Sequence, residues 1–228
     1  MKRTASIEAL IKKARETLVD LKQAYEKSLH EKTVREDLCV DIKNIFENLR
    51  SCLDYLAHEI FEKHCSGLAK PARLYFPIRS SLAYFSQVMA RDFPKIETTC
   101  KPVFDYLEAI QPYHAPWLGQ FNKLNNENKH QNLSEQTRTE TRTVSVTRPG
   151  SGGGVSWGSG VTFGGGVQVM GVPIDPRTQL PVPNSQVQTT VTTWIDFRFT
   201  EIDASALPFV EVSINNVEAA FKELSRHC

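Results

Sequence analysis

The feature that most constrains the fold is a change of hydrophobic period near residue 138. Before that point, apolar residues recur at steps of three and four, which is the spacing of one helix face. From about residue 138 to residue 199 they alternate, as on one face of a strand, and ten of the twelve glycines lie between Gly150 and Gly171. We therefore expect a mainly α protein, a helical bundle with an inserted glycine-rich antiparallel β segment, α+β overall.

The helical part of the pattern predicts six helices. One apolar stripe runs from Ile7 to Tyr25, and a longer one from Leu38 to Ile60 predicts a helix over residues 33–65. Prolines and polar caps indicate shorter helices over 81–91, 102–110 and 116–133. A last stripe covers 210–224. The expected organisation is a helical bundle over 1–137, a β insertion over 138–200, and a C-terminal helix over 201–228 that packs back on the bundle.

The β insertion contains two alternating stretches, residues 141–147 and 187–199, which predict antiparallel strands. Between them, residues 151–160 read Ser-Gly-Gly-Gly-Val-Ser-Trp-Gly-Ser-Gly. This run lacks the Lys-Ser/Thr that ends a phosphate-binding loop, and it precedes a strand, whereas a dinucleotide-binding fingerprint opens a helix. We therefore interpret the glycines as turns between strands.

Charge and cysteine content set limits on function class. The formal net charge is +1, so no global attraction to nucleic acid is expected, although residues 69–148 hold 11 basic and 7 acidic side chains. The five cysteines are odd in number and contain no C-x-x-C pair, which is typical of reduced intracellular thiols. No secretory leader and no bilayer-length apolar run are recognised, so we expect a cytoplasmic chain that does not enter the membrane.

A row of polar residues lies along the long helix, opposite its apolar stripe. Arg50, Asp54 and His58 follow one another at one-turn intervals. One interpretation is a solvated ladder of i,i+4 ion pairs. The other is that a further element covers the face, because Phe46, Ala57 and Phe61 border it, which would make an Arg-Asp pair structural or functional.

The helix over 116–133 has polar residues where its stripe should stay apolar. Asn125, Asn128 and Asn132 continue that stripe, and Lys129 and His130 follow within the same turn. Asparagine is a poor helix former, so the pattern indicates a buried polar network or a site, with helix termination as the alternative. Asp54/His58 and Glu127/His130 have ligand-like spacing, but neither pair forms a specific metal motif. We expect no metal and no small-molecule cofactor.

Four motifs, in order, resemble a group of uncharacterised bacterial and phage helical proteins. They are Arg50-Ser-Cys-Leu-Asp-Tyr-Leu-Ala57, Phe76-Pro-Ile78, Gln111-Pro-Tyr113 and Leu124-Asn-Asn-Glu-Asn-Lys-His130. Those proteins in turn resemble the HEPN superfamily of small helical bundles, which are often dimeric and include metal-independent ribonucleases. The resemblance implies an Arg and a His near a dimer axis, the His moving a proton and the Arg stabilising phosphate charge.

Seven residues separate Arg50 from His58, whereas the HEPN pattern has four to six. Two hypotheses follow. The first is a HEPN-like ribonuclease or RNA-binding protein of a defence or toxin system, with RNA and a second copy of the chain as partners. Its candidate site residues are Arg50, Asp54, His58, Asn128, Lys129 and His130. The second, which we favour, is a non-enzymatic interaction or structural module whose polar cluster is a buried clasp.

Overall fold

The computed structural model describes residues 1–228 except 29–35, 66, 68, 70, 131–135 and 151–152. The described chain is mixed α+β, with seven helices and antiparallel strand pairs. It divides into two compact units. The helical unit comprises residues 1–137 and 197–228, and the β unit comprises residues 138–196.

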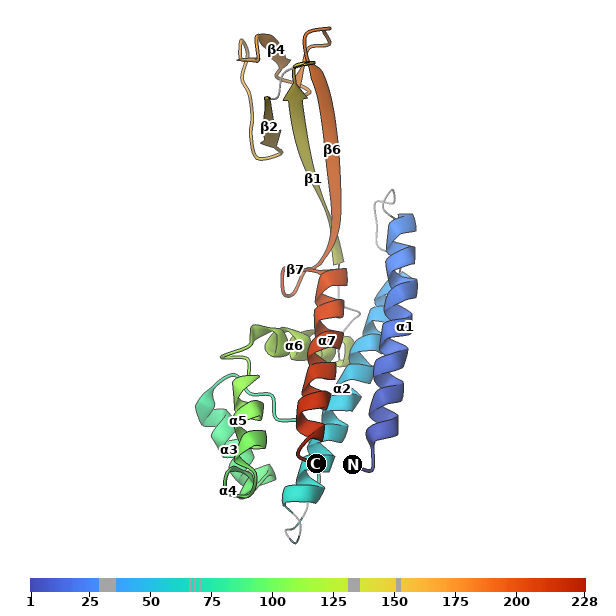
Figure 1. Ribbon diagram of the computed structural model, residues 1–228, viewed down its shortest axis with the longest axis vertical. Helices are drawn as coiled ribbons and strands as arrows, with labels where there is room; N and C mark the ends of the chain where they lie inside the picture. Colours follow the sequence, from blue (N-terminus) through green and yellow to red (C-terminus); the bar gives the residue numbers. More distant parts are fainter. Residues whose placement is uncertain (29–35, 66, 68, 70, 131–135, 151–152) are drawn as a thin grey trace. The chain divides into compact units, whose positions relative to one another are not determined.

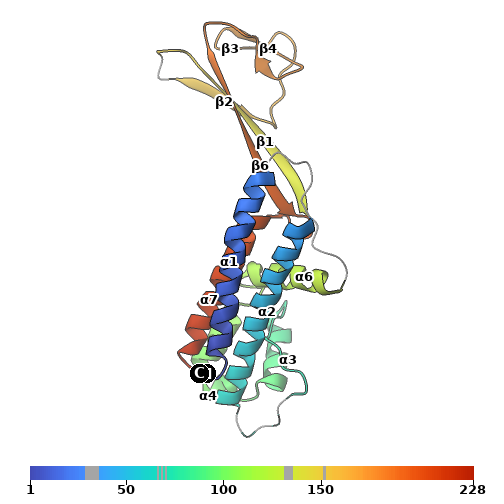
Figure 2. The ribbon, with the colours of Figure 1, turned by 90° about the vertical axis from the view of Figure 1, so that its right-hand side faces the viewer.

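Three long helices lie side by side in the helical unit (Figure 1, Figure 2). They are α1 (Thr4–Ser28), α2 (Glu36–His64) and α7 (Ala206–Ser225). The predicted stripes are their contact faces: Ile7, Leu21, Leu49 and Ile214 are each at most 1% exposed. These helices form because one apolar face repeats at the helical period and is removed from water by its neighbours. Residues 33–35 of the predicted second helix lie outside the described residues.

Four shorter helices complete the helical unit: α3 (Leu82–Asp92), α4 (Ile96–Thr99), α5 (Lys101–Ala109) and α6 (Pro116–His130). Ser81 caps α3, its Oγ accepting the Tyr84 backbone N–H at 3.4 Å. The predicted helices over 81–91 and 102–110 are confirmed. The sequence did not predict α4, because four residues are too few to show a period. The last three residues of the helix predicted over 116–133 lie outside the described part of the chain.

An aromatic cluster joins distant segments in the core of the helical unit. The ring of Phe46 on α2 lies 5.6 Å from Phe121, 6.0 Å from Phe199 and 6.2 Å from Phe209. These three rings come from α6, from the end of β6 (Gln188–Phe199) and from α7. Because Phe199 is fully buried here, the last residues of β6 belong to the helical unit. The β unit therefore ends at Asp196, four residues before the expected boundary at 200.

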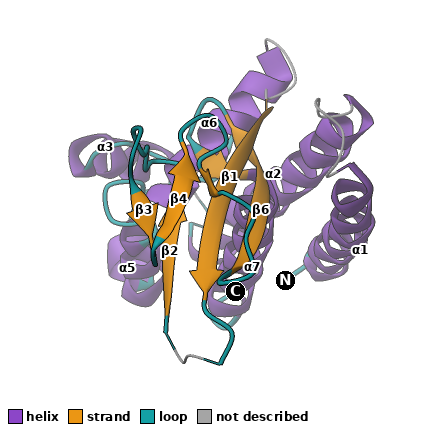
Figure 3. Cartoon of the chain, turned by 90° about the horizontal axis from the view of Figure 1, so that it is seen from above, coloured by secondary structure: helices purple, strands orange, loops and turns teal. Residues whose placement is uncertain are grey.

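The strands form two sheets (Figure 3). One has the order β2-β1-β6-β7, with β1 at Gln136–Thr147, β2 at Gly154–Gly158 and β7 at Ala204–Ser205. The other has the order β3-β4-β5, with strands at Gln168–Val169, Val172–Asp175 and Leu180–Pro181. β1 and β2 pair antiparallel, with Val144 opposite Trp157. Gly154 is required at the start of β2, since an added Cβ would lie 2.8 Å from Thr147 Cγ2 and 3.0 Å from the Val146 carbonyl oxygen.

The β unit has a small core of its own, made by Val144, Val146, Trp157, Val169, Val172, Ile174 and Val187. The prediction that alternate residues from Val187 to Phe199 share one face does not translate into uniform burial. Val191, in the middle of β6, is 41% exposed, whereas Val187 is 8% exposed. Alternation specifies which side of a strand a residue occupies, but burial needs another layer over that side.

Candidate functional site

The polar residues of α2 meet the connector between α2 and α3, which we call the 71–81 connector. Leu74, Phe76 and Ile78 of this segment are each at most 6% exposed. The segment has no regular secondary structure, so its buried backbone groups cannot be satisfied by a helix or sheet ladder. Side chains of α2 and of the turn that follows α5 supply hydrogen bonds to these groups.

Asp54 connects α2 to the connector. Its Oδ1 accepts the Phe76 backbone N–H at 2.9 Å and lies 3.2 Å from Arg50 Nη2. Its Oδ2 accepts from Arg50 Nε, also at 3.2 Å. The two side chains are 22% and 13% exposed, so this is a largely covered pair and not a solvated ladder. Both carboxylate oxygens are already engaged by groups of the chain itself.

Arg50 also reaches α6. Its Nη1 donates to Asn122 Oδ1 at 3.4 Å, a long hydrogen bond between half-buried side chains. One turn further along α6, Asn125 is 1% exposed, as the interrupted apolar stripe predicted. The hydrogen bond from Arg50 to α6 is therefore made to Asn122, which precedes the asparagine-rich segment identified in the sequence.

Gln111 holds the other side of the connector and is fully buried. Its Nε2 donates to the carbonyl oxygens of Pro77 at 2.8 Å and Leu107 at 2.7 Å. Its Oε1 accepts the Arg79 backbone N–H at 2.8 Å. All three of these hydrogen bonds are made to backbone groups, and together they tie the connector to the end of α5. We call Arg50, Asp54, Asn122 and Gln111 the connector clasp.

Three arginines gather beside the clasp. Burial lowers the pKa of Arg79, with Arg91 and Arg50 acting in the same direction and Asp92 opposing them. Arg91 forms a two-pronged pair with Asp92, Nε to Oδ1 and Nη2 to Oδ2, each at 2.7 Å. The Arg79 Nη1 donates to the Ile78 carbonyl at 2.7 Å. This grouping of positive charge favours an anionic partner.

The structure brings two of the six candidate site residues together. Arg50 and Asp54 form the pair described above, and His58 is half-buried one turn further along α2. Asn128, Lys129 and His130 close α6, and their side chains lie outside the described residues. The pairing of the α2 row with these three residues therefore stays a prediction.

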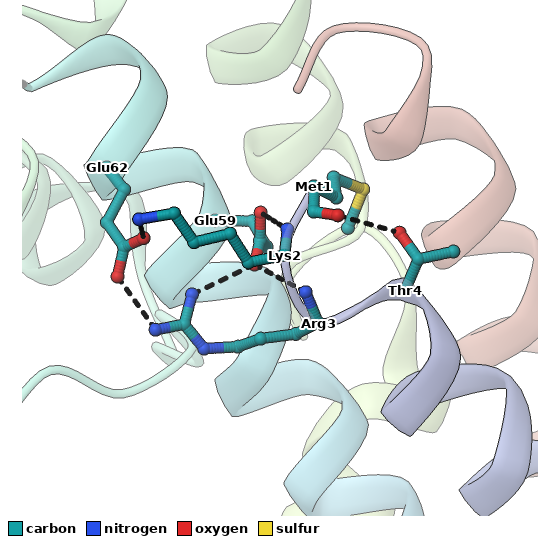
Figure 4. A network of polar contacts seen from close by, with 6 residues as sticks. All are labelled: Met1, Lys2, Arg3, Thr4, Glu59 and Glu62. Carbon is teal, nitrogen blue, oxygen red and sulfur yellow. Dashed lines mark hydrogen bonds and ion pairs between the residues drawn. The ribbon is translucent and has the colours of Figure 1, made fainter.

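A second clasp, which sequence reasoning missed, closes the start of α1 (Figure 4). Glu59 on α2 is 5% exposed and accepts the backbone N–H groups of Lys2 and Arg3, each at 2.9 Å. The Arg3 side chain also donates two hydrogen bonds, from Nη1 to Glu59 Oε1 at 2.9 Å and from Nη2 to Glu62 Oε1 at 2.7 Å. A carboxylate at a helix N-terminus satisfies unpaired N–H groups and complements the helix dipole. On the helical wheel Glu59 lies roughly 75° from the centre of the apolar stripe, which is the signal that could have marked it as covered.

In the described part of the chain, no three His, Cys, Asp or Glu side chains gather closely enough to hold a metal ion. Among the same residues, no helix combines the length and apolar character needed to cross a bilayer.

The chain matches no protein-family model, and neither the curated proteins nor the solved structures contain a significant match.

Proposed function

We propose that this chain is a non-enzymatic interaction module of the cytoplasm, a helical bundle with an inserted β segment. In it the polar residues of α2 shape the surface and do not catalyse a reaction. The observation that carries the proposal is the engagement of Asp54: one oxygen holds the Phe76 N–H at 2.9 Å and both oxygens contact Arg50. A carboxylate used in this way is a structural acceptor, because acting as a base would break the contacts that position it.

The clasp fixes the connector, which carries the exposed Tyr75 and leads into α3, whose first turn carries the exposed Leu82 and Tyr84. Tyr75 is 54%, Leu82 56% and Tyr84 60% exposed, although their neighbours Phe76 and Phe85 are buried. Tyrosine combines a large apolar area with a polar tip, which suits it to protein interfaces. In the proposal this surface, made by Tyr75, Leu82 and Tyr84, contacts a second copy of the chain.

The first experiment compares two aspartates by urea unfolding. Asp54→Ala leaves the Phe76 N–H and the Arg50 guanidinium without their acceptor, so we expect a loss of about 2–4 kcal/mol. Asp105→Ala is the matched control, since its i,i+4 pair with Lys101 is exposed to solvent and should contribute little to stability. Equal effects of the two substitutions would contradict the clasp.

The second experiment measures the oligomeric state by light scattering after size-exclusion chromatography. We expect the wild-type chain to form dimers at micromolar concentration, and Tyr75→Ser with Tyr84→Ser to shift it to monomers. The control is Val19→Ser on α1, an exposed apolar residue of another surface. A wild-type monomer at all concentrations would refute the dimer surface.

The alternative is the HEPN-like ribonuclease or RNA-binding protein, favoured by the grouping of Arg50, Arg79 and Arg91. Its test is incubation of the protein with labelled RNA, with and without a chelator. RNA cleavage by the wild-type chain that His58→Ala or His130→Ala abolishes, with unchanged melting temperature, would establish this alternative. The alternative would be excluded if the RNA stays intact and if Arg79→Gln leaves the amount of RNA that the protein retains on a filter unchanged from wild type.

A further inference from the structure

The β unit contains a pocket of about 250 Å³ that none of the features above uses. Its walls come from β1, from the turn after β2 and from the turn that joins β4 to β5. The polar residues around it are Arg142, Trp157, Ser159, Arg177, Thr178 and Gln179. Within the described part of the chain, no acidic side chain lines it. The lining thus contains two arginines together with residues that carry hydroxyl and amide groups.

Arg142 lies on the inner face of β1. Side chains two residues apart on a strand point to the same side, and Val144 and Val146 of that side are at most 3% exposed. Val144 is directly opposite Trp157, so Arg142 is the diagonal neighbour of the Trp157 ring. A cation therefore occupies a position that the strand pattern would assign to an apolar residue.

This guanidinium is half-buried and has no hydrogen-bond or ion-pair partner among the described residues. Glu140, two residues before it on the same strand, is instead paired with Arg138 at 2.9 Å. Withdrawing a cation from water without an anion is unfavourable. An anionic ligand would provide the partner that the half-buried Arg142 lacks.

The opposite wall is held rigidly. The Asp175 carboxylate accepts the Arg177 backbone N–H at 2.8 Å, and the Asp175 carbonyl accepts the Gln179 N–H at 2.8 Å. The Gln179 side chain in turn binds both backbone groups of Phe163, at 2.7 and 3.1 Å. The Arg177 side chain itself is 89% exposed and lies 3.8 Å from Asp175, so it is able to turn toward the pocket. A fixed turn with one adjustable cation is suited to closing over a ligand.

Trp157 lines the same pocket from β2. It is 7% exposed and packs edge-on against Phe163, with ring centroids 5.1 Å apart. Its indole Nε1 is buried and has no acceptor within the part of the structure described. A buried N–H without an acceptor is uncommon in native proteins. The Trp157 ring thus borders the space that an oxyanion would occupy, and the oxyanion would provide the acceptor that Arg142 lacks.

We propose that this pocket binds the oxyanion group, carboxylate or phosphate, of a small organic molecule. Arg142 donates from within the pocket and Arg177 closes over the ligand, because the guanidinium fork matches both kinds of oxyanion. The pocket volume of about 250 Å³ suits a small oxyanion group. This inference concerns the β unit alone and does not depend on the proposed role of the connector clasp.

The test uses the full chain and two probes, inorganic phosphate and acetate, followed by ¹H–¹⁵N correlation spectra and by thermal melting. The Trp157 indole signal is assigned by its loss in Trp157→Phe. We expect one probe or both to shift that signal saturably and to raise the melting temperature, as ligands that bind only the folded state do. Saturation by phosphate but not acetate identifies a phosphate site, and the converse identifies a carboxylate site.

Two variants decide the assignment. Arg142→Gln should weaken binding about tenfold or more, because it removes a charge-assisted hydrogen bond to the ligand. The melting temperature measured without a probe should be unchanged or higher. Arg73→Gln makes the same charge change at an exposed residue of the 71–81 connector and should leave binding unchanged. The proposal is overturned if neither probe gives a saturable shift, or if binding survives in Arg142→Gln.

Discussion

Replacing Gln111 by leucine would show how strongly the connector clasp stabilises the helical unit. Leucine keeps most of the side-chain volume, so the packing around the site is largely preserved. The substitution removes three hydrogen bonds of 2.7–2.8 Å. Gln111 donates two of them, to the carbonyls of Pro77 and Leu107, and accepts the third from the backbone N–H of Arg79. Because Gln111 is fully buried, water cannot reach these groups without opening the structure.

The expected loss follows from those three groups. A buried polar group left without a partner costs about 1–3 kcal/mol, and partial relaxation reduces the sum, so we expect about 2–5 kcal/mol in total. The assay is urea unfolding followed by far-ultraviolet circular dichroism at the helical band, with the free energy taken by linear extrapolation. Gln87→Leu, at an exposed position of α3, is the matched control and should change stability by less than about 0.5 kcal/mol.

A small effect would refute this reasoning. If Gln111→Leu and Gln87→Leu unfold at the same urea concentration with the same slope, the three hydrogen bonds do not hold the connector. A lower slope for Gln111→Leu alone would instead indicate that the connector detaches while the rest of the helical unit stays folded.

Three further predictions concern the core, the charge clasp and the β unit. Phe46→Ala should cost about 3–5 kcal/mol in urea unfolding, because it empties the centre of a four-ring cluster; a loss under about 1 kcal/mol would contradict that role. The hydrogen bond from Arg3 lowers the pKa of Glu62 to about 2. The stabilisation that the ionised Glu62 provides is therefore complete above the unfolded-state pKa of this carboxyl group, near 4.5, and is lost as the pH falls toward 2. The urea midpoints of wild type and Glu62→Gln should accordingly converge near pH 2, and a constant difference down to that pH would be inconsistent with the shift. Gly154→Ala should lower the protection of the β1 and β2 amides in hydrogen exchange, since its methyl group meets the Val146 carbonyl oxygen at 3.0 Å, and unchanged protection would show that the strand pair adjusts.

The helices were predictable because their information is local. The stripe of α2 repeats every three or four residues, and Leu38, Ile45, Leu53 and Ile60 are each at most 2% exposed. The same holds for α7, where Val210, Ile214 and Val217 are fully buried. α4 and the two-residue strands were not predicted, since two to four residues are too short to show a period. For the Asp54 face the sequence left two interpretations open, a solvated ladder and a face covered by another element, and the structure shows the second.

The identity of that covering element could not be predicted. Asp54 is satisfied by the backbone of Phe76, 22 residues away, and Arg50 by Asn122, 72 residues away. No periodicity links such positions, since they meet only after the connector and α6 have packed on α2. Glu59 illustrates the same limit, because its partners Lys2 and Arg3 precede it by more than fifty residues.

The sequence by itself thus determined where the chain is helical, where it alternates as strands, which polar residues of α2 lie opposite its apolar stripe, and which polar residues interrupt the stripe of α6. Only the tertiary structure decided what those residues do. It assigned Asp54 and Gln111 to one clasp and placed Arg142 on an inner face beside Trp157. The physical reason is that secondary structure follows from spacing along the chain, whereas a hydrogen-bond partner or a pocket is defined by distances between segments that the spacing does not specify.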